Sequence, residues 1–489
     1  MQKIIIYLVS FFIYSVLHAQ TITGTIKDAN TQMPISYASI QIHQDQGTVS
    51  NEEGKFEINI STVKPTDSLK ISFLGYQTKT FGITEVPETI FLEEDVIDLE
   101  AVNLDQKQLS IAEIIQKITD NYAKNYQGIE HSKQRIFIRN QSIVKVKKFK
   151  MEINHAKNYE KKNIRKINSL IDSIRKPMLA NTSLEYRDVL FDLYNKSKDS
   201  AKVSFIKATN LSNPNQNYTL EGVNDKLKEG FKQLFKDKIF KIKILFFKVE
   251  DSLKTDEIVK KEKQLAVYPF VMAKQMKQLY KHTIYPNNAL LSEILNPKYY
   301  EYKITNNLFY NNEFVYEITY TPKKSKAKYQ GKMYVSDETF AIIKLDFNML
   351  PNKKLEGTNL KLLGVSYKIY DWNGSLEYYQ NENDVYVPKY FKQSKKMYNY
   401  ASVPLKFIEN TPNKNKLKFK LKSTFETLMQ QKSEILFLKN TPLSETAYEQ
   451  VKIKKEFPLE KIKKYNPEIW KKYNIIAPSQ QLLEYQIVE

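Results

Sequence analysis

The stretch that most constrains the fold is residues 47–60, "GTVSNEEGKFEINI", where a polar turn precedes a strictly alternating segment. Asn51 and Gly54 suit the turn because Asn and Gly tolerate left-handed backbone conformations. Phe56, Ile58 and Ile60 then alternate with polar residues, as side chains do along a strand with one buried face. Similar alternation occurs at 21–28, 38–43, 68–76 and 88–94. Residues 21–104 are therefore predicted to form a small β-sandwich of about six or seven strands.

This segment resembles the carboxypeptidase regulatory-like domain, a transthyretin-like sandwich common in exported and outer-membrane proteins of Bacteroidota. The family pattern has G-x-V-x-D in its first strand, then P-x-x-x-A-x-V, a T-[DN]-x-x-G-x-[FY] turn and a strand that ends in Gly-Tyr or Gly-Phe. The matching residues are Gly24, Asp28, Pro34, Ala38, Ser50, Asn51, Gly54, Phe56, Gly75 and Tyr76. Ser50 stands where Thr is usual, and Asn51 where Asp is commoner.

The resemblance implies a folding, docking or spacer module, because the sandwich of this family carries no zinc ligands and no nucleophile. A carboxypeptidase activity would follow only from the name of the domain.

Residues 1–20 have the features of a secretory signal peptide: Lys3, an apolar run from Ile4 to Leu17, and the small residue Ala19 near a cleavage point. The run is shorter than the ~20 residues that span a bilayer, which disfavours a retained anchor. Cysteine is absent, so we expect neither disulfides nor a lipid-attachment cysteine. The sequence therefore predicts an exported protein, in the periplasm or associated with the outer membrane.

At 489 residues, the chain is too long for one ordinary core. The predicted fold class is mainly β, with the sandwich followed by an α+β domain that contains a large, curved, half-barrel-like antiparallel sheet. The predicted divisions are the signal peptide at 1–20, the sandwich at 21–104, a mixed helical and strand region at 105–298, the antiparallel sheet at 299–430, and a C-terminal helix and tail at 431–489.

Helical spacing of apolar residues predicts a helix at 109–126, with Ser110 and Glu113 placed to form a capping box. Beyond it the pattern is mixed and the order of elements stays open. The expected elements are a strand at 133–140 and helical stretches around 160–176, 224–249 and 270–281.

Residues 299–425 contain repeated alternating segments separated by turn residues, which predicts neighbouring antiparallel strands. The predicted turns are Asn311-Asn312, Asp337-Glu338 and Asn373-Gly374, of which Asn-Gly is the strongest hairpin signal. After the sheet, Trp470, Tyr473 and Ile475 are expected to attach the C-terminal tail to the domain.

The hairpin at 331–347, "GKMYVSDETFAIIKLDF", is weakly similar to hairpins of bacterial lipoprotein carriers, in which a half-barrel sheet holds an acyl chain. This likeness implies a lipid or other hydrophobic ligand on the concave face of the sheet. An ordinary core hairpin gives the same pattern, so both interpretations stay open. The candidate lining residues are Tyr316, Tyr334, Ile343 and Phe347.

The net charge of +20 comes mainly from lysine, and the only arginines are Arg135, Arg139, Arg165, Arg175 and Arg187. Nucleic-acid recognition favours the bidentate guanidinium group, so a solvated lysine surface is the better interpretation and nucleic acid is not expected as a partner. Contact with anionic lipid head groups at the outer membrane is an alternative.

No catalytic or metal-binding motif is present. Beyond His18, the histidines are His43, His131, His155 and His282, none in H-E-x-x-H or at metal-ligand spacing. The sequence also lacks G-x-S-x-G, a P-loop and G-x-G-x-x-G. We therefore predict no enzyme, no metal and no cofactor.

Three functions remain as hypotheses. The first is a binding or scaffolding protein of the cell envelope that docks to another envelope protein through the sandwich. The second is a periplasmic carrier of a lipid or hydrophobic ligand, and the third is a hydrolase whose site is assembled from residues far apart in the sequence.

Overall fold

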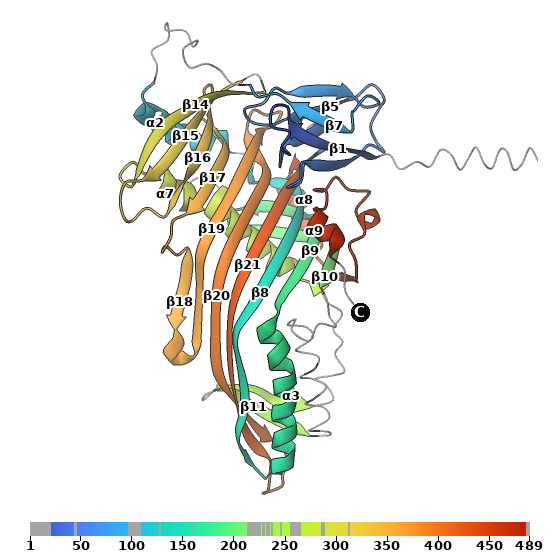
Figure 1. Cartoon of the computed structure of the whole chain (residues 1–489), viewed down its shortest axis with the longest axis vertical. Helices are drawn as coiled ribbons and strands as arrows, with labels where there is room; N and C mark the ends of the chain where they lie inside the picture. The colour runs from blue at the N-terminus through green and yellow to red at the C-terminus, as the bar shows by residue number, and fades with distance from the viewer. Residues whose placement is uncertain are drawn as a thin grey trace, which may run out of the picture.

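The computed structural model describes residues 21–43, 46–95, 109–126, 129–158, 160–212, 226, 230, 235, 238–244, 247–254, 266–284, 289–311 and 313–485. The predicted signal peptide lies outside the described residues. The molecule is elongated, with a small β-sandwich at one end and a large sheet whose longest strands run along the long axis (Figure 1).

The N-terminal strands form the predicted sandwich. One sheet has the order β4-β1-β7 and the other the order β3-β2-β5-β6. Their apolar side chains, including Ile26, Phe56 and Ile71, form a buried cluster. The strands are β1 (Thr21–Asp28), β2 (Ser39–His43), β3 (Gln46–Val49), β4 (Lys55–Asn59), β5 (Ser68–Ser72), β6 (Lys79–Gly82) and β7 (Thr89–Leu92).

Contacts within the sandwich explain the residues that carry the family resemblance. A Cβ on Gly24 would lie 2.6 Å from the ring of Phe56, so only glycine lets that ring pack across β1. Gly54 has φ +73°, the left-handed conformation required by the predicted turn. The hydroxyl of Tyr76 donates to Asp28 Oδ2 at 2.8 Å and ties the Gly-Tyr corner to the end of β1.

The first helix, α2 (Ile111–Asn125), begins with the predicted capping box between Ser110 and Glu113. Its buried face packs into the main core of the second domain. Just after it, the hydroxyl of Tyr126 donates to the carbonyl of Ile342 at 2.7 Å. The helix is thereby fixed to the hairpin of β16 (Tyr329–Ser336) and β17 (Ile342–Met349).

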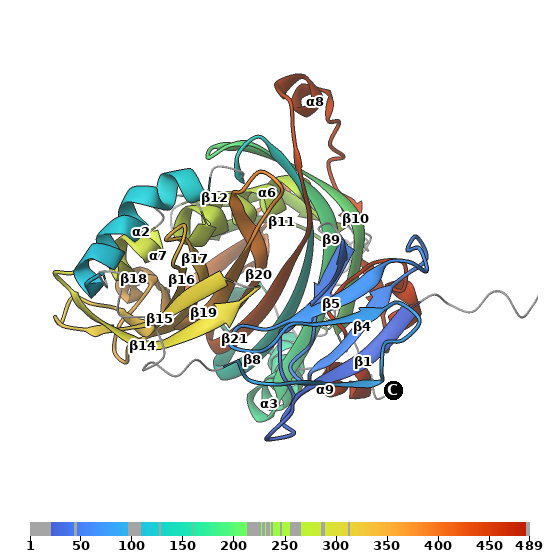
Figure 2. The same ribbon diagram turned by 90° about the horizontal axis from the view of Figure 1, so that it is seen from above.

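The large sheet has the order β14-β15-β16-β17-β19-β20-β21-β8-β9-β10-β23. It is antiparallel except for the β10–β23 pair, and it curves strongly when viewed from above (Figure 2). Its other strands are β8 (Ser132–Lys157), β9 (Thr182–Ser197), β10 (Ser200–Ser212), β14 (Tyr300–Tyr310), β15 (Glu313–Pro322), β19 (Val365–Gln380), β20 (Tyr386–Glu409), β21 (Lys418–Pro442) and β23 (Glu460–Ile462), with β18 (Glu356–Leu360) paired beside β19.

The sheet extends beyond the predicted 299–430 region, because β8, β9 and β10 come from residues 132–212 and β21 continues to Pro442. The centre of the sheet joins distant segments, as the pairing of Ile138 with Ile435 shows. Periodicity identifies a strand but not its partner, so the sequence did not indicate this pairing.

The predicted helical stretch at 224–249 is wrong in its second half, although residues 226 and 230 are helical. The described part of 224–249 includes β11 (Ile239–Ile244) and the start of β12 (Phe247–Lys254), which pair with each other, and β11 also pairs with β20. The segment "IFKIKI" alternates with period two, which favours a strand over a helix.

The predicted hairpin turn at Asn373-Gly374 is also wrong, because both residues lie inside β19. Gly374 pairs with Phe347 on one side and with Gln393 on the other. A Cβ at Gly374 would lie 2.8 Å from the ring of Phe347 and 2.6 Å from the carbonyl oxygen of Lys392. Glycine is required here for close packing rather than for a turn.

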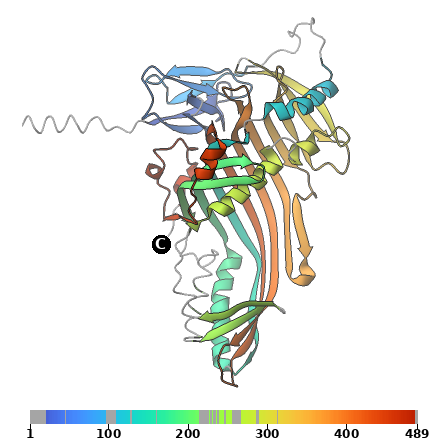
Figure 3. The ribbon, with the colours of Figure 1, turned by 180° about the vertical axis from the view of Figure 1, so that it is seen from behind.

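Two helical predictions are confirmed. α3 (Lys161–Ala180) places Ile167, Ile171 and Ile174 in a separate apolar cluster at the far end of the long strands. α6 (Pro269–Leu279) continues into a π-helical turn, η3 (Tyr280–Ile284), and crosses the strands of the sheet on the face seen in Figure 3.

The C-terminal segment packs on the sheet, as predicted from its apolar residues. Trp470 and Ile475 are buried together with Phe137 of β8. The elements after β21 are α8 (Glu445–Gln450), β22 (Phe457–Pro458), β23, η5 (Pro467–Ile469) and α9 (Gln480–Glu484). β22 pairs with β13 (Ala266–Val267). The short helix α7 (Ala289–Ile294) lies near β14 (Figure 1).

A buried ion pair fixes this C-terminal segment to the sheet. Arg139 of β8 lies 2.9 Å from Asp188 of β9, and both side chains are almost completely buried. The Nη1 atom of Arg139 also donates to the carbonyls of Ile476 and Ala477. One guanidinium therefore links two strands to the tail.

The sandwich packs against the rest of the chain. The ring of Tyr37 stacks on Tyr390 of β20 with centroids 5.1 Å apart, and Lys392 donates to the Tyr37 hydroxyl at 2.8 Å. The Thr48 hydroxyl donates to the carbonyl of Ile475 at 2.9 Å. The sandwich thus has a docking partner within its own chain.

Within the described part of the chain, none of the helices combines the length and the apolar character needed to cross a membrane.

Candidate ligand-binding site

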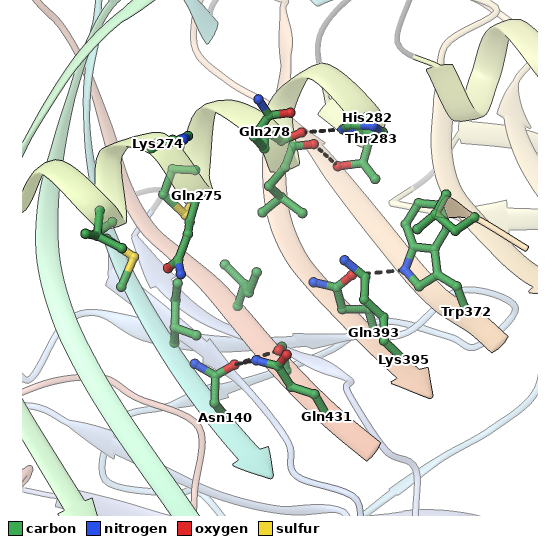
Figure 4. A pocket seen from close by; sticks show the side chains of 18 of the residues that line it. Asn140, Lys274, Gln275, Gln278, His282, Thr283, Trp372, Gln393, Lys395 and Gln431 are labelled. Atoms are coloured by element: carbon green, nitrogen blue, oxygen red, sulfur yellow. Dashed lines mark hydrogen bonds between the residues drawn. The ribbon is translucent and has the colours of Figure 1, made fainter. Parts of the chain in front are cut away.

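A cavity of about 620 Å³ lies between α6–η3 and the large sheet. Its floor comes from β8, β19, β20 and β21, and its roof from the helix (Figure 4). Leu355 and Glu356, at the start of β18, complete one side. The site therefore combines residues from the beginning, middle and end of the second domain.

The register of the strands arranges the floor in rows. Asn140 and Gln393 both pair with Ser433, which forms a polar row across β8, β21 and β20. Ile138 and Ile435 form the adjacent row, which is apolar. Since neighbouring rows on one face are two residues apart, the floor changes from apolar to polar along the strands.

Hydrogen bonds hold the polar row in place. The Ser433 hydroxyl donates to Asn140 Oδ1 at 2.6 Å, and the indole nitrogen of Trp372 donates to Gln393 Oε1 at 3.0 Å. In Figure 4, the side chains of Asn140, Trp372, Gln393 and Gln431 lie on the side of the sheet that faces α6. The floor therefore presents oriented amides beside an aromatic ring.

The roof is also amphipathic. Pro269 occupies the first turn of α6, where its missing N–H costs no helical hydrogen bond. Met272, Met276 and Leu279 supply apolar lining, and methionine adapts readily to irregular ligand surfaces. Gln275 and Gln278 add amides to the lining.

Exposed apolar residues lie beside the cavity at the start of α6. Val271 lines it and is exposed, and the neighbouring Phe270 is 80% exposed. The approach to the cavity on this side is therefore apolar.

Lys395 is the charged group most enclosed by the site. Burial lowers the pKa of its amine, and the Glu356 carboxylate acts in the opposite direction. The Nζ atom lies 5.3 Å from the centre of the Trp372 ring, and no carboxylate of the described residues lies within ion-pair distance of it. A partly desolvated cation in an amide-rich cavity favours a ligand that carries negative charge.

The four residues predicted to line a ligand site lie elsewhere in the sheet. Tyr334, Ile343 and Phe347 are buried in the main core, and Tyr316 is partly buried with its hydroxyl bonded to Asp337. Ile343 lines a cavity of about 10 Å³ between the sandwich and the sheet. Phe347 packs 4.7 Å from Trp372 and so lies behind the wall of the large cavity.

His43, His131 and His282 lie in separate parts of the described structure. His43 lies 3.2 Å from Asp67 in the sandwich, and His131 is exposed. His282 lines the cavity, where its Nδ1 donates to the carbonyl of Gln278 at 2.8 Å. The described residues contain no group of three or more His, Asp and Glu side chains arranged to hold a metal ion.

The cavity residues were missed because they come from segments far apart in the sequence. A signal was nevertheless present, since "QSK" at 393–395 and "QKS" at 431–433 place polar side chains two residues apart, flanked on the same strand faces by Phe391 and Met397 and by Met429 and Ile435. Polar pairs on an inward-facing side indicate a lined cavity rather than a packed core.

Comparisons with known proteins identify the sandwich. Residues 22–104 match the family described as CarboxypepD_reg-like domain, which confirms the resemblance seen in the sequence. A search of curated proteins gives no match.

Among solved structures, the chain is similar to a candidate membrane-associated protein of unknown function from Bacteroides fragilis NCTC 9343. The identity is 10%, and the similarity covers 85% of this chain and 97% of the other. The TM-score is 0.12, so this likeness carries no argument about function.

Proposed function

We propose that this protein is an exported envelope protein that binds an amphipathic ligand with a negatively charged group in the cavity beneath α6. The observation that supports this proposal best is the gradient of the lining, from Ile138 and Ile435 to the amides and Lys395. The volume of about 620 Å³ lies within the usual range of small-molecule sites.

The proposal develops the carrier hypothesis and moves its site. The ligand would lie between the helix and the centre of the sheet, rather than against Tyr316, Tyr334, Ile343 and Phe347. Its apolar part would contact Met272, Met276 and Ile435, and its anionic group would approach Lys395. The contacts between the sandwich and Tyr390, Lys392 and Ile475 make a docking role toward another protein the weaker alternative.

A fluorescent fatty acid with a dansyl group provides the first test. We expect saturable binding, with energy transfer from Trp372, because this residue lines the cavity. Gln275→Trp should block the site, since Gln275 lines the cavity from an exposed position on α6. Gln116→Trp, the same change at an exposed position of α2, is the matched control and should leave binding unchanged.

The charge of the ligand is tested with Lys395→Met. This variant should weaken binding of the carboxylate probe by about tenfold or more, as expected for loss of a hydrogen bond to a charged group. Binding of the methyl ester of the same probe should change little. Equal affinity of Gln275→Trp and the unmodified protein for the probe would contradict the proposed position of the site. Equal effects of Lys395→Met on both probes would contradict a contact between Lys395 and the anionic group of the ligand.

A further inference from the structure

The hairpin between β18 and β19 ends in an exposed apolar tip, defined here as Leu360, Leu362, Leu363 and Val365. Leu362 is fully exposed and Leu363 is 66% exposed. All five residues of β18 are exposed as well. In Figure 1 this hairpin points away from the sandwich, along the side of the long sheet.

Backbone contacts hold this tip in a defined conformation. A short 3₁₀ turn, η4 (Lys361–Leu363), ends at Gly364, which has φ +85°. A Cβ at Gly364 would lie 2.2 Å from the carbonyl of Ser402 on β20, and Ser402 N–H donates to the Gly364 carbonyl at 2.6 Å. The leucines are therefore displayed to solvent by a turn that is fixed to the sheet.

Basic and aromatic residues lie directly behind the tip. Lys361 in the turn and Lys368 on β19 are exposed, and Lys368 pairs with Tyr398 of β20. Lys361 lies over the rings of Tyr398 and Tyr400, at 5.2 and 5.4 Å from their centres. Tyr367 on β19 pairs with Asn399 and so lies on the opposite face of the sheet, where its hydroxyl donates to Glu356. From the tip inwards, the order is leucine, then lysine with tyrosine.

We propose that this tip inserts into the surface of a bilayer that contains anionic lipids. Leucines would enter the acyl region, tyrosines would lie at the level of the head groups, and lysines would contact the lipid phosphates, which is the arrangement that membrane interfaces favour. The net charge of +20 adds long-range attraction to the same surface.

A bilayer suits this surface better than a protein partner does. The tip is a narrow convex hairpin end, whereas stable protein interfaces usually bury on the order of 1,200–2,000 Å² in total. A lipid surface needs no complementary groove. This inference does not depend on the ligand proposal, although Leu355 and Glu356 connect the hairpin to one side of the cavity.

Flotation with liposomes tests the inference with the purified full chain. We expect binding to vesicles of phosphatidylcholine and phosphatidylglycerol, and much weaker binding to phosphatidylcholine alone. The double variant Leu362→Ser/Leu363→Ser should reduce the bound fraction by at least about tenfold, given the apolar area that the two side chains would bury. Met33→Ser, which removes another highly exposed apolar residue, on the sandwich, is the matched control and should bind normally.

A second variant separates insertion from simple adsorption. Leu362→Trp should show a blue-shifted and quencher-protected tryptophan signal on anionic vesicles. A protein that binds these vesicles without such a shift would be held by its lysines alone, and this result would overturn insertion of the tip. Absence of vesicle binding, or an equal loss of binding in Met33→Ser, would overturn the proposal. Self-association in vesicle-free solution that the double serine variant abolishes would also overturn it.

Discussion

Replacing Arg139 by methionine is expected to destabilise the protein strongly. The side chains of Arg139 and Asp188 are only 6% and 3% exposed, so Arg139→Met leaves a buried carboxylate without its partner. Breaking a buried pair in this way typically costs about 3–5 kcal/mol. The loss of the bonds to the Ile476 and Ala477 carbonyls acts in the same direction and should release the C-terminal segment.

The matched control is Arg135→Met on the same strand. Arg135 is 42% exposed, and its partner Asp192 also pairs with Lys133 at 3.1 Å. Arg135→Met should therefore lower the free energy of unfolding by only about 0–1 kcal/mol.

The assay is urea unfolding followed by tryptophan fluorescence in a Trp372→Phe background, where Trp470 alone reports on the C-terminal segment. Adding Asp188→Asn to Arg139→Met should recover about 1–3 kcal/mol, because it removes the unpaired charge. Equal losses of unfolding free energy in Arg139→Met and Arg135→Met would refute the reasoning.

Two further predictions concern single positions in the sheet. Burial raises the pKa of Glu434 above its ordinary value of 4.5, so the folded state still binds a proton at pH values where the unfolded state has released it. The free energy of unfolding should therefore fall as pH rises from 4.5 through the folded pKa. Glu434→Gln should flatten this dependence in melting curves recorded across that pH range. Gly374→Ala should lower the free energy of unfolding by about 1–3 kcal/mol, because the added methyl group overpacks against Phe347. The control is Gly82→Ala, whose Cβ would be no closer than 3.4 Å to Glu85 and which should leave the melting temperature nearly unchanged.

Local patterns predicted local structure well. The capping box at Ser110 and Glu113, the turn at Asn51 and Gly54, and the strands of the sandwich follow from interactions between residues near in sequence. Asn373-Gly374 misled because the same dipeptide that suits a tight turn also suits a strand that passes under a large ring. The deciding neighbour, Phe347, is near only in space.

The candidate site was less predictable for the same reason. Trp372, Gln393, Gln431 and Asn140 meet only because β8 pairs with β21 and β20 pairs with both β21 and β19. An amide in a strand contributes to a ligand site or to a solvated surface according to what covers it, and here α6 is the cover. Strand alternation alone does not indicate which helix crosses which face.

The pairing of β8 with β21 also limits the order in which the parts of the protein can fold. The centre of the sheet closes a loop of about 300 residues, which is entropically costly and slow to form. Until β21 is in place, β8 and β20 each have an unpaired edge, and unpaired strand edges promote aggregation. A chain interrupted before β21 would therefore form two separate half-sheets, with neither the floor of the cavity nor the partner surface for the C-terminal segment.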